Sequence, residues 1–310
     1  MTKISLAENF RAIFYAPLYA LRALDFITRE GLAVEWLPAR APGAVFDEIK
    51  RGTVDLAWGG PMRVIKDRDG GPAAGNSLSC FGEIVSRDPF YLLASPGWQG
   101  CGLSALLGAR LAVVSEVPTP WLCLQADLHD AGVALSSIGD RCDVVTGLSM
   151  EQQFEALGRG EVDVVQLFEP FVSKAVADGA GRIIYSAWER GPTTYTTFIC
   201  ALDGMARHQE PFRRVTVALG SVQQWIASHD ADELAEVIAP FFRDIPSTLL
   251  RTAVRRYHSA RIWSRHTELG REGFDRLARS LCLGGFVGAL QSYEHCVADV
   301  GELPASATRT

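Results

Sequence analysis

The sequence lacks the features that would assign it to several broad classes of protein. In 310 residues no apolar run approaches the roughly eighteen residues that a membrane-crossing helix needs, which argues against membrane insertion. No segment is rich in lysine and arginine, and the formal net charge is −6, so nothing attracts the phosphates of nucleic acid or anionic lipid. The first residues, MTKISLAENF, alternate as a strand does and do not resemble a leader peptide. We therefore expect no nucleic-acid partner and no membrane insertion.

Cysteine is present, but in no functional pattern. The seven cysteines are scattered along the chain, are odd in number and include no C-x-x-C pair. This distribution predicts reduced thiols and not a disulfide framework, and hence a cytoplasmic location for the chain as written. A periplasmic location is the alternative if a leader has been removed.

The motifs of metal-dependent and covalent catalysis are missing as well. The sequence contains no H-E-x-x-H, no G-x-S-x-G and no phosphate-binding G-x-x-x-x-G-K. His258 and His266 share one helical region, but no carboxylate or thiol near them completes a set of metal ligands. We predict no metal site, no cofactor and no catalytic residue.

What the sequence does contain is a repeated phrase. FDEIKRGTVDLAW begins at Phe46 and FEALGRGEVDVVQ begins at Phe154, 154 − 46 = 108 residues later. In each copy an apolar helix face is followed by a glycine that favours a helix end, Gly52 or Gly160. A run rich in β-branched and apolar residues comes next and reads as a buried strand. Each copy is therefore a helix–glycine–strand unit.

The flanks of the two copies also match. Strands are expected at 3–7 and 32–37 before the first copy, and at 111–114 and 142–145 before the second, with a helix between the members of each pair. Two β-α-β-α-β units in series are thus predicted, which makes the chain an α/β protein. From residue 205 onward the apolar residues follow helical spacing, so the last third is predicted to be helical.

The chain resembles a known family of proteins. The order of elements, with the phrases YAPLYALRALDFITREGLAVEW, RGTVDLAWGG, LGRGEVDVVQLFEP and RIWSRHTELGREGFDRLARSLCLGGFV, resembles the type II periplasmic-binding-protein fold. Over nearly its whole length the chain is similar to nitrate, sulfonate and taurine solute-binding proteins and to the thiamine-pyrimidine synthases. The resemblance implies two α/β lobes, joined by crossover strands and followed by C-terminal helices, that close on a small molecule. It also implies an ABC permease as a partner.

The resemblance sets the expected domains. Lobe one would comprise 1–95 plus 197–310, including the C-terminal helices, and lobe two 96–196. The crossover strands would lie at 91–94 and 195–199.

Ligands of such sheets bind beyond the carboxyl ends of the strands. The residues there that we expect to bind a ligand are Phe10, Arg11, Phe14, Tyr15, Trp58, Gly59, Gly60, Ser115, Thr119, Trp121, Glu169 and Tyr195. Four of the aromatic residues could sandwich a flat aromatic or heteroaromatic group, or could be plain core: Phe14, Tyr15, Trp58 and Trp121.

The charge of the ligand stays open at this stage. Ser115 and Thr119 precede a helix whose free N–H groups favour an anion, although Thr119 could simply cap that helix. Glu169 could accept hydrogen bonds from an amine, or could instead belong to a lobe ion pair with an arginine. Arg11, Arg63 and Arg87 could instead receive a carboxylate or a sulfonate.

Two enzymes share the architecture, and neither chemistry carries over. The pyrimidine synthase that this chain resembles uses a histidine where this chain has Arg63, and it carries a cluster of cysteines that this chain lacks. The aromatic desulfinase resemblance requires a cysteine and an arginine where this chain has Phe10 and Ala57. We therefore favour a solute-binding protein, with an intracellular enzyme of either type or a ligand sensor as the alternatives.

Overall fold

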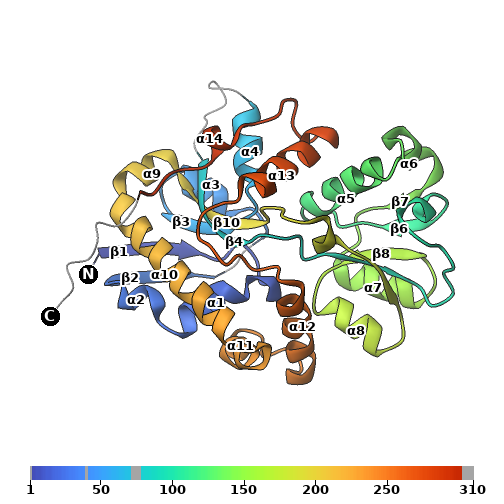
Figure 1. The fold of residues 1–310 in the computed structure, drawn as a ribbon, viewed down its shortest axis with the longest axis horizontal. Helices are drawn as coiled ribbons and strands as arrows, with labels where there is room; N and C mark the ends of the chain where they lie inside the picture. The colour runs from blue at the N-terminus through green and yellow to red at the C-terminus, as the bar shows by residue number, and fades with distance from the viewer. Residues whose placement is uncertain (1, 39–40, 71–77, 302–310) are drawn as a thin grey trace.

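The computed structural model describes residues 2–38, 41–70 and 78–301, and it contains two sheets in two bodies that lie side by side (Figure 1). The first sheet has the strand order β2-β1-β3-β10-β4 and the second has the order β7-β6-β8-β5-β9. The strands of the first sheet are β1 (Thr2–Ala7), β2 (Leu32–Leu37), β3 (Leu56–Gly59), β4 (Leu78–Val85) and β10 (Thr196–Ala201). Those of the second are β5 (Tyr91–Ala94), β6 (Arg110–Ala112), β7 (Asp143–Val145), β8 (Val164–Leu167) and β9 (Arg182–Ser186).

The two sheets have the same topology. In each sheet the first three strands of the spatial order pair in parallel. The fourth strand of that order is antiparallel to both of its neighbours, and the chain reaches it directly after crossing from the other sheet. This fourth strand is β10 in the first sheet and β5 in the second. The chain changes sheet at 86–90 and again at 187–195, just before each of the strands expected as crossovers. By sheet membership, residues 91–94 therefore lie with the second body.

The repeated phrase occupies equivalent places in the two bodies. Its helices are α3 (Val45–Lys50) and α7 (Met150–Gly158), and its strands are β3 and β8, each the third strand of its sheet. A capping box opens the helix of the second copy, because Ser149 Oγ accepts from Gln152 N and the Gln152 side chain accepts from Ser149 N.

The aspartate of the repeat has one structural role in both copies. The Asp55 carboxylate accepts hydrogen bonds from the backbone N–H and the hydroxyl of Ser5 in β1, at 2.8 and 2.9 Å. The Asp163 carboxylate accepts from the backbone N–H of Arg110 in β6 at 2.8 Å, and from its guanidinium. Each carboxylate therefore ties the strand of the repeat, β3 or β8, to the parallel strand beside it, β1 or β6.

Helices cover both sheets. The remaining helices of the N-terminal two thirds are α1 (Ala16–Ala23), α2 (Phe26–Arg29), α4 (Met62–Asp69), α5 (Thr119–Asp130), α6 (Leu135–Arg141) and α8 (Phe171–Ala177). The single helix expected before Gly31 is interrupted, because Asp25 adopts a left-handed conformation with φ 54° between α1 and α2. Among the described residues, no helix is both long and apolar enough to cross a membrane.

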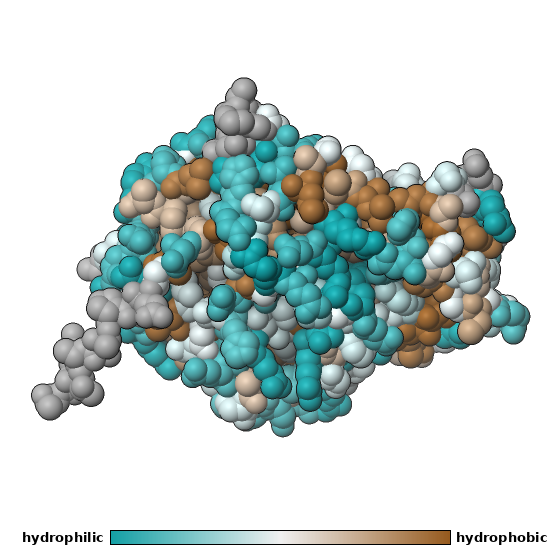
Figure 2. Space-filling view, turned by 45° about the horizontal axis from the view of Figure 1, so that its top comes forward, coloured by the Kyte–Doolittle hydropathy of each residue, from teal (hydrophilic) through white to brown (hydrophobic). Residues whose placement is uncertain are grey.

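The last third is helical, as predicted. Its helices are α9 (Leu202–Arg207), α10 (Gln209–Ser228), α11 (Ala231–Ile238), α12 (Ser247–Ala260), α13 (Arg271–Leu283) and α14 (Tyr293–Cys296). α10 packs on α1 and α2 of the first body, whereas α12 contacts α8 and α13 contacts α5 of the second (Figure 1). The space-filling view shows hydrophilic residues across the middle of this face and apolar residues gathering on the second body at the right (Figure 2). The C-terminal helices thus flank the junction between the bodies on two sides.

Candidate ligand-binding site

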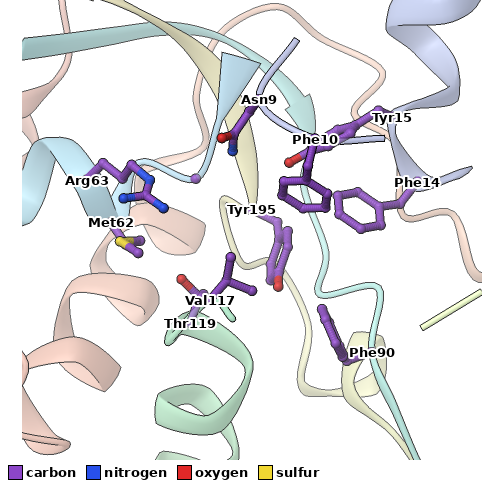
Figure 3. A pocket seen from close by; sticks show the side chains of 11 residues that line it. Asn9, Phe10, Phe14, Tyr15, Met62, Arg63, Phe90, Val117, Thr119 and Tyr195 are labelled. Carbon is purple, nitrogen blue, oxygen red and sulfur yellow. The ribbon is translucent and has the colours of Figure 1, made fainter. Parts of the chain in front are cut away.

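A cavity lies between the two bodies, where β1, β3 and β6 end (Figure 3). Its lining residues are Asn9, Phe10, Phe14, Tyr15, Gly60, Met62, Arg63, Phe90, Val117, Thr119 and Tyr195. Both chain crossings contribute, through Phe90 and Tyr195, so the cavity touches the two bodies and the segments that join them. Its free volume is about 30 Å³, room for little more than water. A larger ligand therefore requires the bodies to separate or the side chains to move.

One side of the cavity is aromatic. Phe14 contacts Tyr15 at a centroid distance of 4.3 Å, and meets Tyr195 edge to face at 5.9 Å. Phe10 lies 5.2 Å from Tyr15, also edge to face. Burial raises the pKa of Tyr15 and of Tyr195 well above the usual range, so both hydroxyls stay protonated and can donate hydrogen bonds.

The other side carries a guanidinium. Arg63 lies in the first turn of α4, and Figure 3 shows its side chain opposite the aromatic rings. Its guanidinium lies 5.0 Å from the centre of the Phe46 ring. Burial lowers the pKa of Arg63, and the negative charge of Asp47 opposes this, but a guanidinium remains charged in proteins. Within the described part of the chain, no hydrogen bond or salt bridge holds this guanidinium.

Gly43 and Asn9 keep this side of the cavity open and polar. A Cβ at Gly43 would lie 2.6 Å from an Arg63 Nη atom, so the guanidinium would have to shift, and the φ of +88° at this position itself favours glycine. The Asn9 carbonyl oxygen accepts a hydrogen bond from Gly43 N at 2.8 Å, which fixes the amide. The Asn9 side chain also opposes the rise in the pKa of Tyr15.

The second body contributes the start of α5. Leu122 N bonds to Pro118 O at 3.1 Å, so the N–H groups of Thr119 and Trp121 have no acceptor within the helix. Thr119, the first residue of α5, lines the cavity, and the positive end of the helix dipole therefore faces it. Thr119 does not cap this helix, whose N-cap position is Pro118.

Six of the twelve expected residues come together around the cavity: Phe10, Phe14, Tyr15, Gly60, Thr119 and Tyr195. Ser115, Trp121 and Gly59 do not line it. Ser115 Oγ accepts from Gly147 N at 3.0 Å, and Trp121 packs on the core of the second body. Gly59 is required for packing, because a Cβ there would lie 2.6 Å from the ring of Phe46.

Three further expected residues have structural roles. Arg11 is exposed and pairs with Glu8 at 3.1 Å. Trp58 is buried in the core behind Tyr15, with ring centroids 6.1 Å apart. Glu169 is fully buried and forms the alternative that we named from the sequence, an ion pair with an arginine across the junction. Arg87, named with the arginines, donates to Trp188 O at 3.1 Å and is not in the cavity lining.

Five lining residues were not among those expected: Asn9, Met62, Arg63, Phe90 and Val117. Asn9 directly precedes the expected Phe10 at the end of β1. Arg63 was named as a possible anion ligand, but its position one turn after Gly60 was not used. Both lie beyond strand ends, which is the signal that could have found them.

A buried ion-pair network joins the two chain crossings to α5. Arg190, in the second crossing, pairs with Asp88 of the first at 2.5 Å and with Asp127 of α5. Tyr185 Oη also donates to Asp127 at 2.8 Å. Side chains of Asp88 and Arg190 are 0% and 6% exposed, so the network fixes the crossings in a dry environment. No group of three or more His, Cys, Asp or Glu residues among the described residues could hold a metal ion.

Comparisons with known sequences agree with this architecture. Residues 104–239 match the model of the NMT1-like family. The protein YtlA of Bacillus subtilis (strain 168), whose name gives a binding role as provisional, is 24% identical over 272 residues. That match covers 85% of this chain and 78% of the relative.

Solved structures show the same fold. The periplasmic aliphatic sulphonate binding protein SsuA of Escherichia coli has a TM-score of 0.78 at 13% identity, over 100% of this chain and 96% of that chain. The alkanesulfonate-binding protein SsuA of Xanthomonas axonopodis pv. citri, solved bound to MOPS, has a TM-score of 0.70 at 14% identity. The match covers 94% of this chain and 95% of that chain. The predicted two-lobed type II periplasmic-binding-protein fold is confirmed, and the NMT1-like match supports the predicted resemblance to the nitrate, sulfonate and taurine solute-binding family.

Proposed function

We propose that this chain, a two-lobed protein with the fold of the solute-binding proteins, binds a small organic anion in the cavity between its lobes. The observation that carries the proposal is Arg63, a partly buried guanidinium that faces the cavity without a salt bridge to any described residue. A charge removed from water without a partner is costly, and an anionic group would supply that partner.

The surroundings of Arg63 favour the same sign of charge. Thr119 brings the positive end of α5 to the cavity, and the Tyr15 and Tyr195 hydroxyls stay protonated. None of the described residues that line the cavity is a carboxylate, so an anion there meets donors and no acidic side chain among them. A carboxylate or a sulfonate has oxygens that a guanidinium can bind in pairs.

Binding would couple to movement of the lobes. The free volume of about 30 Å³ is too small for such a ligand, while the 86–90 and 187–195 segments are the only described links between the sheets along the chain. We propose that these segments act as the hinge, and that the ligand stabilises a closed arrangement. The domain division expected from the sequence, 1–95 plus 197–310 and 96–196, stays a prediction apart from the place of residues 91–94.

The partner and the compartment are proposals of the same kind. The SsuA proteins named above are described as binding proteins for sulfonates, which supports an ABC permease as the partner of this chain. The described cysteines are free thiols, five of them buried, which supports the cytoplasmic location; a periplasmic location remains the alternative.

Isothermal titration calorimetry tests the proposed function. The probes are benzenesulfonate and its uncharged analogue methyl phenyl sulfone. We expect the wild type to bind the sulfonate more tightly, and Arg63→Gln to weaken sulfonate binding about 10- to 100-fold by removing charge-assisted hydrogen bonds. Arg11→Gln is the matched control, because that exposed arginine lies outside the cavity. Equal affinity for both probes, or no effect of Arg63→Gln, would contradict the proposal.

A further inference from the structure

A second hollow opens directly beside the cavity. It shares Phe10 and Val117 with the cavity and has a free volume of about 410 Å³. We refer to it as the groove, and its other lining residues are Pro42, Glu116, Ser149, Met150, Glu151, Phe168 and Phe171. Because two residues belong to both spaces, a molecule held at Arg63 could extend past Phe10 and Val117 into the groove.

Aromatic rings continue from the cavity into the groove. Phe14, in the cavity, meets Phe168 edge to face at 5.5 Å, and Phe168 meets Phe171 edge to face at 6.4 Å. Phe171, the first residue of α8, is only partly buried, so its ring remains available to a further contact. A planar apolar group fits such a wall better than a polar one, since ring edges and faces give large contact area with few rotatable bonds.

The rim of the groove is acidic. Glu116 and Glu151 both line it, and neither forms a salt bridge with a described residue. Partial burial of its carboxyl group raises the pKa of Glu116, whose side chain is otherwise exposed, and a hydrogen bond from the Met150 backbone opposes the rise. Whereas Arg63 supplies positive charge in the cavity, the groove therefore offers two carboxylates, and a second negative charge on the ligand would face repulsion.

We propose that the ligand is an amphiphilic monoanion, whose anionic head lies at Arg63 and whose apolar, preferably aromatic, tail lies in the groove against Phe168 and Phe171. The groove selects the tail and excludes a second anionic group. This inference rests on the proposed function, because the head must occupy the cavity for the tail to reach the groove.

The test measures affinities of sulfonates that share one head. Methanesulfonate, benzenesulfonate and benzene-1,3-disulfonate are titrated calorimetrically, with acetate and phenylacetate as carboxylate counterparts. We expect benzenesulfonate to bind at least tenfold more tightly than methanesulfonate, and at least tenfold more tightly than the disulfonate. The carboxylate pair shows which head the cavity prefers, and the same gain from the ring is expected there.

Variants assign these differences to the groove. Phe171→Ala should bring the benzenesulfonate-to-methanesulfonate affinity ratio toward one. The double variant Glu116→Gln/Glu151→Gln changes only exposed side chains and should narrow the gap between benzenesulfonate and the disulfonate. Glu155→Gln, on the same helix as Glu151 but paired with Arg159 away from the groove, is the matched control and should leave that gap as it is.

The outcomes separate the two proposals. If no sulfonate or carboxylate binds, the proposed function fails and the inference fails with it. If the head group binds in an Arg63-dependent way but neither the ring nor the second charge alters affinity, the inference alone is wrong. A gap to the disulfonate that persists in the glutamine double variant would also overturn the role of the acidic rim.

Discussion

The Arg256 Nε donates to Glu169 Oε1 at 2.6 Å, and this pair joins helix α12 to the second lobe. Glu169 also accepts from the backbone N–H and the hydroxyl of Ser173, at 2.9 and 2.8 Å. On the same helix, Tyr257 Oη accepts from Glu169 N at 2.9 Å. The carboxylate is thus fully committed to the contact between the lobe and the C-terminal helices.

Removal of Arg256 should leave a buried charge without its cation. We predict that Arg256→Met lowers the free energy of unfolding by about 3 kcal/mol in urea titrations at pH 8. Burial already raises the pKa of Glu169, and loss of the arginine raises it further, so protonation should make the loss smaller at pH 5. The double variant Glu169→Gln/Arg256→Met should lose less than Arg256→Met alone; an equal or larger loss would refute the pairing.

The stability of the protein should also depend on the buried ion-pair network that joins the two chain crossings to α5. We predict that Arg190→Met costs about 3 to 5 kcal/mol, because Asp88 would remain buried without a cation. The comparison is Arg159→Met, which breaks exposed pairs with Glu155 and Glu161 and should leave the free energy of unfolding nearly unchanged. Similar losses for the two variants would contradict a structural role for the buried network.

The buried Glu83 carboxyl should make the free energy of unfolding depend on pH. Burial raises its pKa from 4.5 to about 7, partly opposed by the hydrogen bond that Ser264 Oγ donates to the Glu83 carboxylate. Because the folded pKa lies above the unfolded one, the contribution of Glu83 is fully present below about pH 4.5 and is lost as pH rises through 7. Relative to Glu83→Gln, the wild type should lose about 3 kcal/mol between pH 4.5 and pH 8 in urea unfolding. Parallel pH profiles for the two proteins would exclude this assignment.

Trp58 should contribute to the free energy of unfolding through its packing in the core. It is 3% exposed and lies between Tyr15 and Tyr19, at centroid distances of 6.1 and 6.5 Å. We predict that Trp58→Ala lowers the free energy of unfolding by about 3 to 5 kcal/mol. A variant that keeps wild-type stability but loses ligand affinity would place the ring in the binding site instead.

The fold could be predicted because its signals are local. The repeated segments that begin at Phe46 and Phe154 each form a helix and a strand, and the two strands occupy the same position in two equivalent sheets. The Asp55 and Asp163 carboxylates, one in each phrase, tie each unit to its first strand. Helical spacing likewise identified the C-terminal helices.

The site could be predicted only in part, because side-chain direction depends on packing between segments far apart in the chain. Trp58 is in a strand end with flanking glycines, but its ring turns into the core. Glu169 has the chemistry of a ligand contact, yet Arg256, 87 residues away, neutralises it. Conversely, Arg63 lines the cavity with its guanidinium close to Gly43, a contact between positions that no sequence pattern connects.

Native mass spectrometry of the freshly purified wild type and of Arg63→Gln tests the central claim most directly, followed by denaturation and identification of the released molecule. We predict that the wild type releases one small molecule per chain, that it carries a single anionic group, and that Arg63→Gln is depleted of it. A bound molecule without an anionic group, or equal occupancy in the two proteins, would contradict anion binding at Arg63.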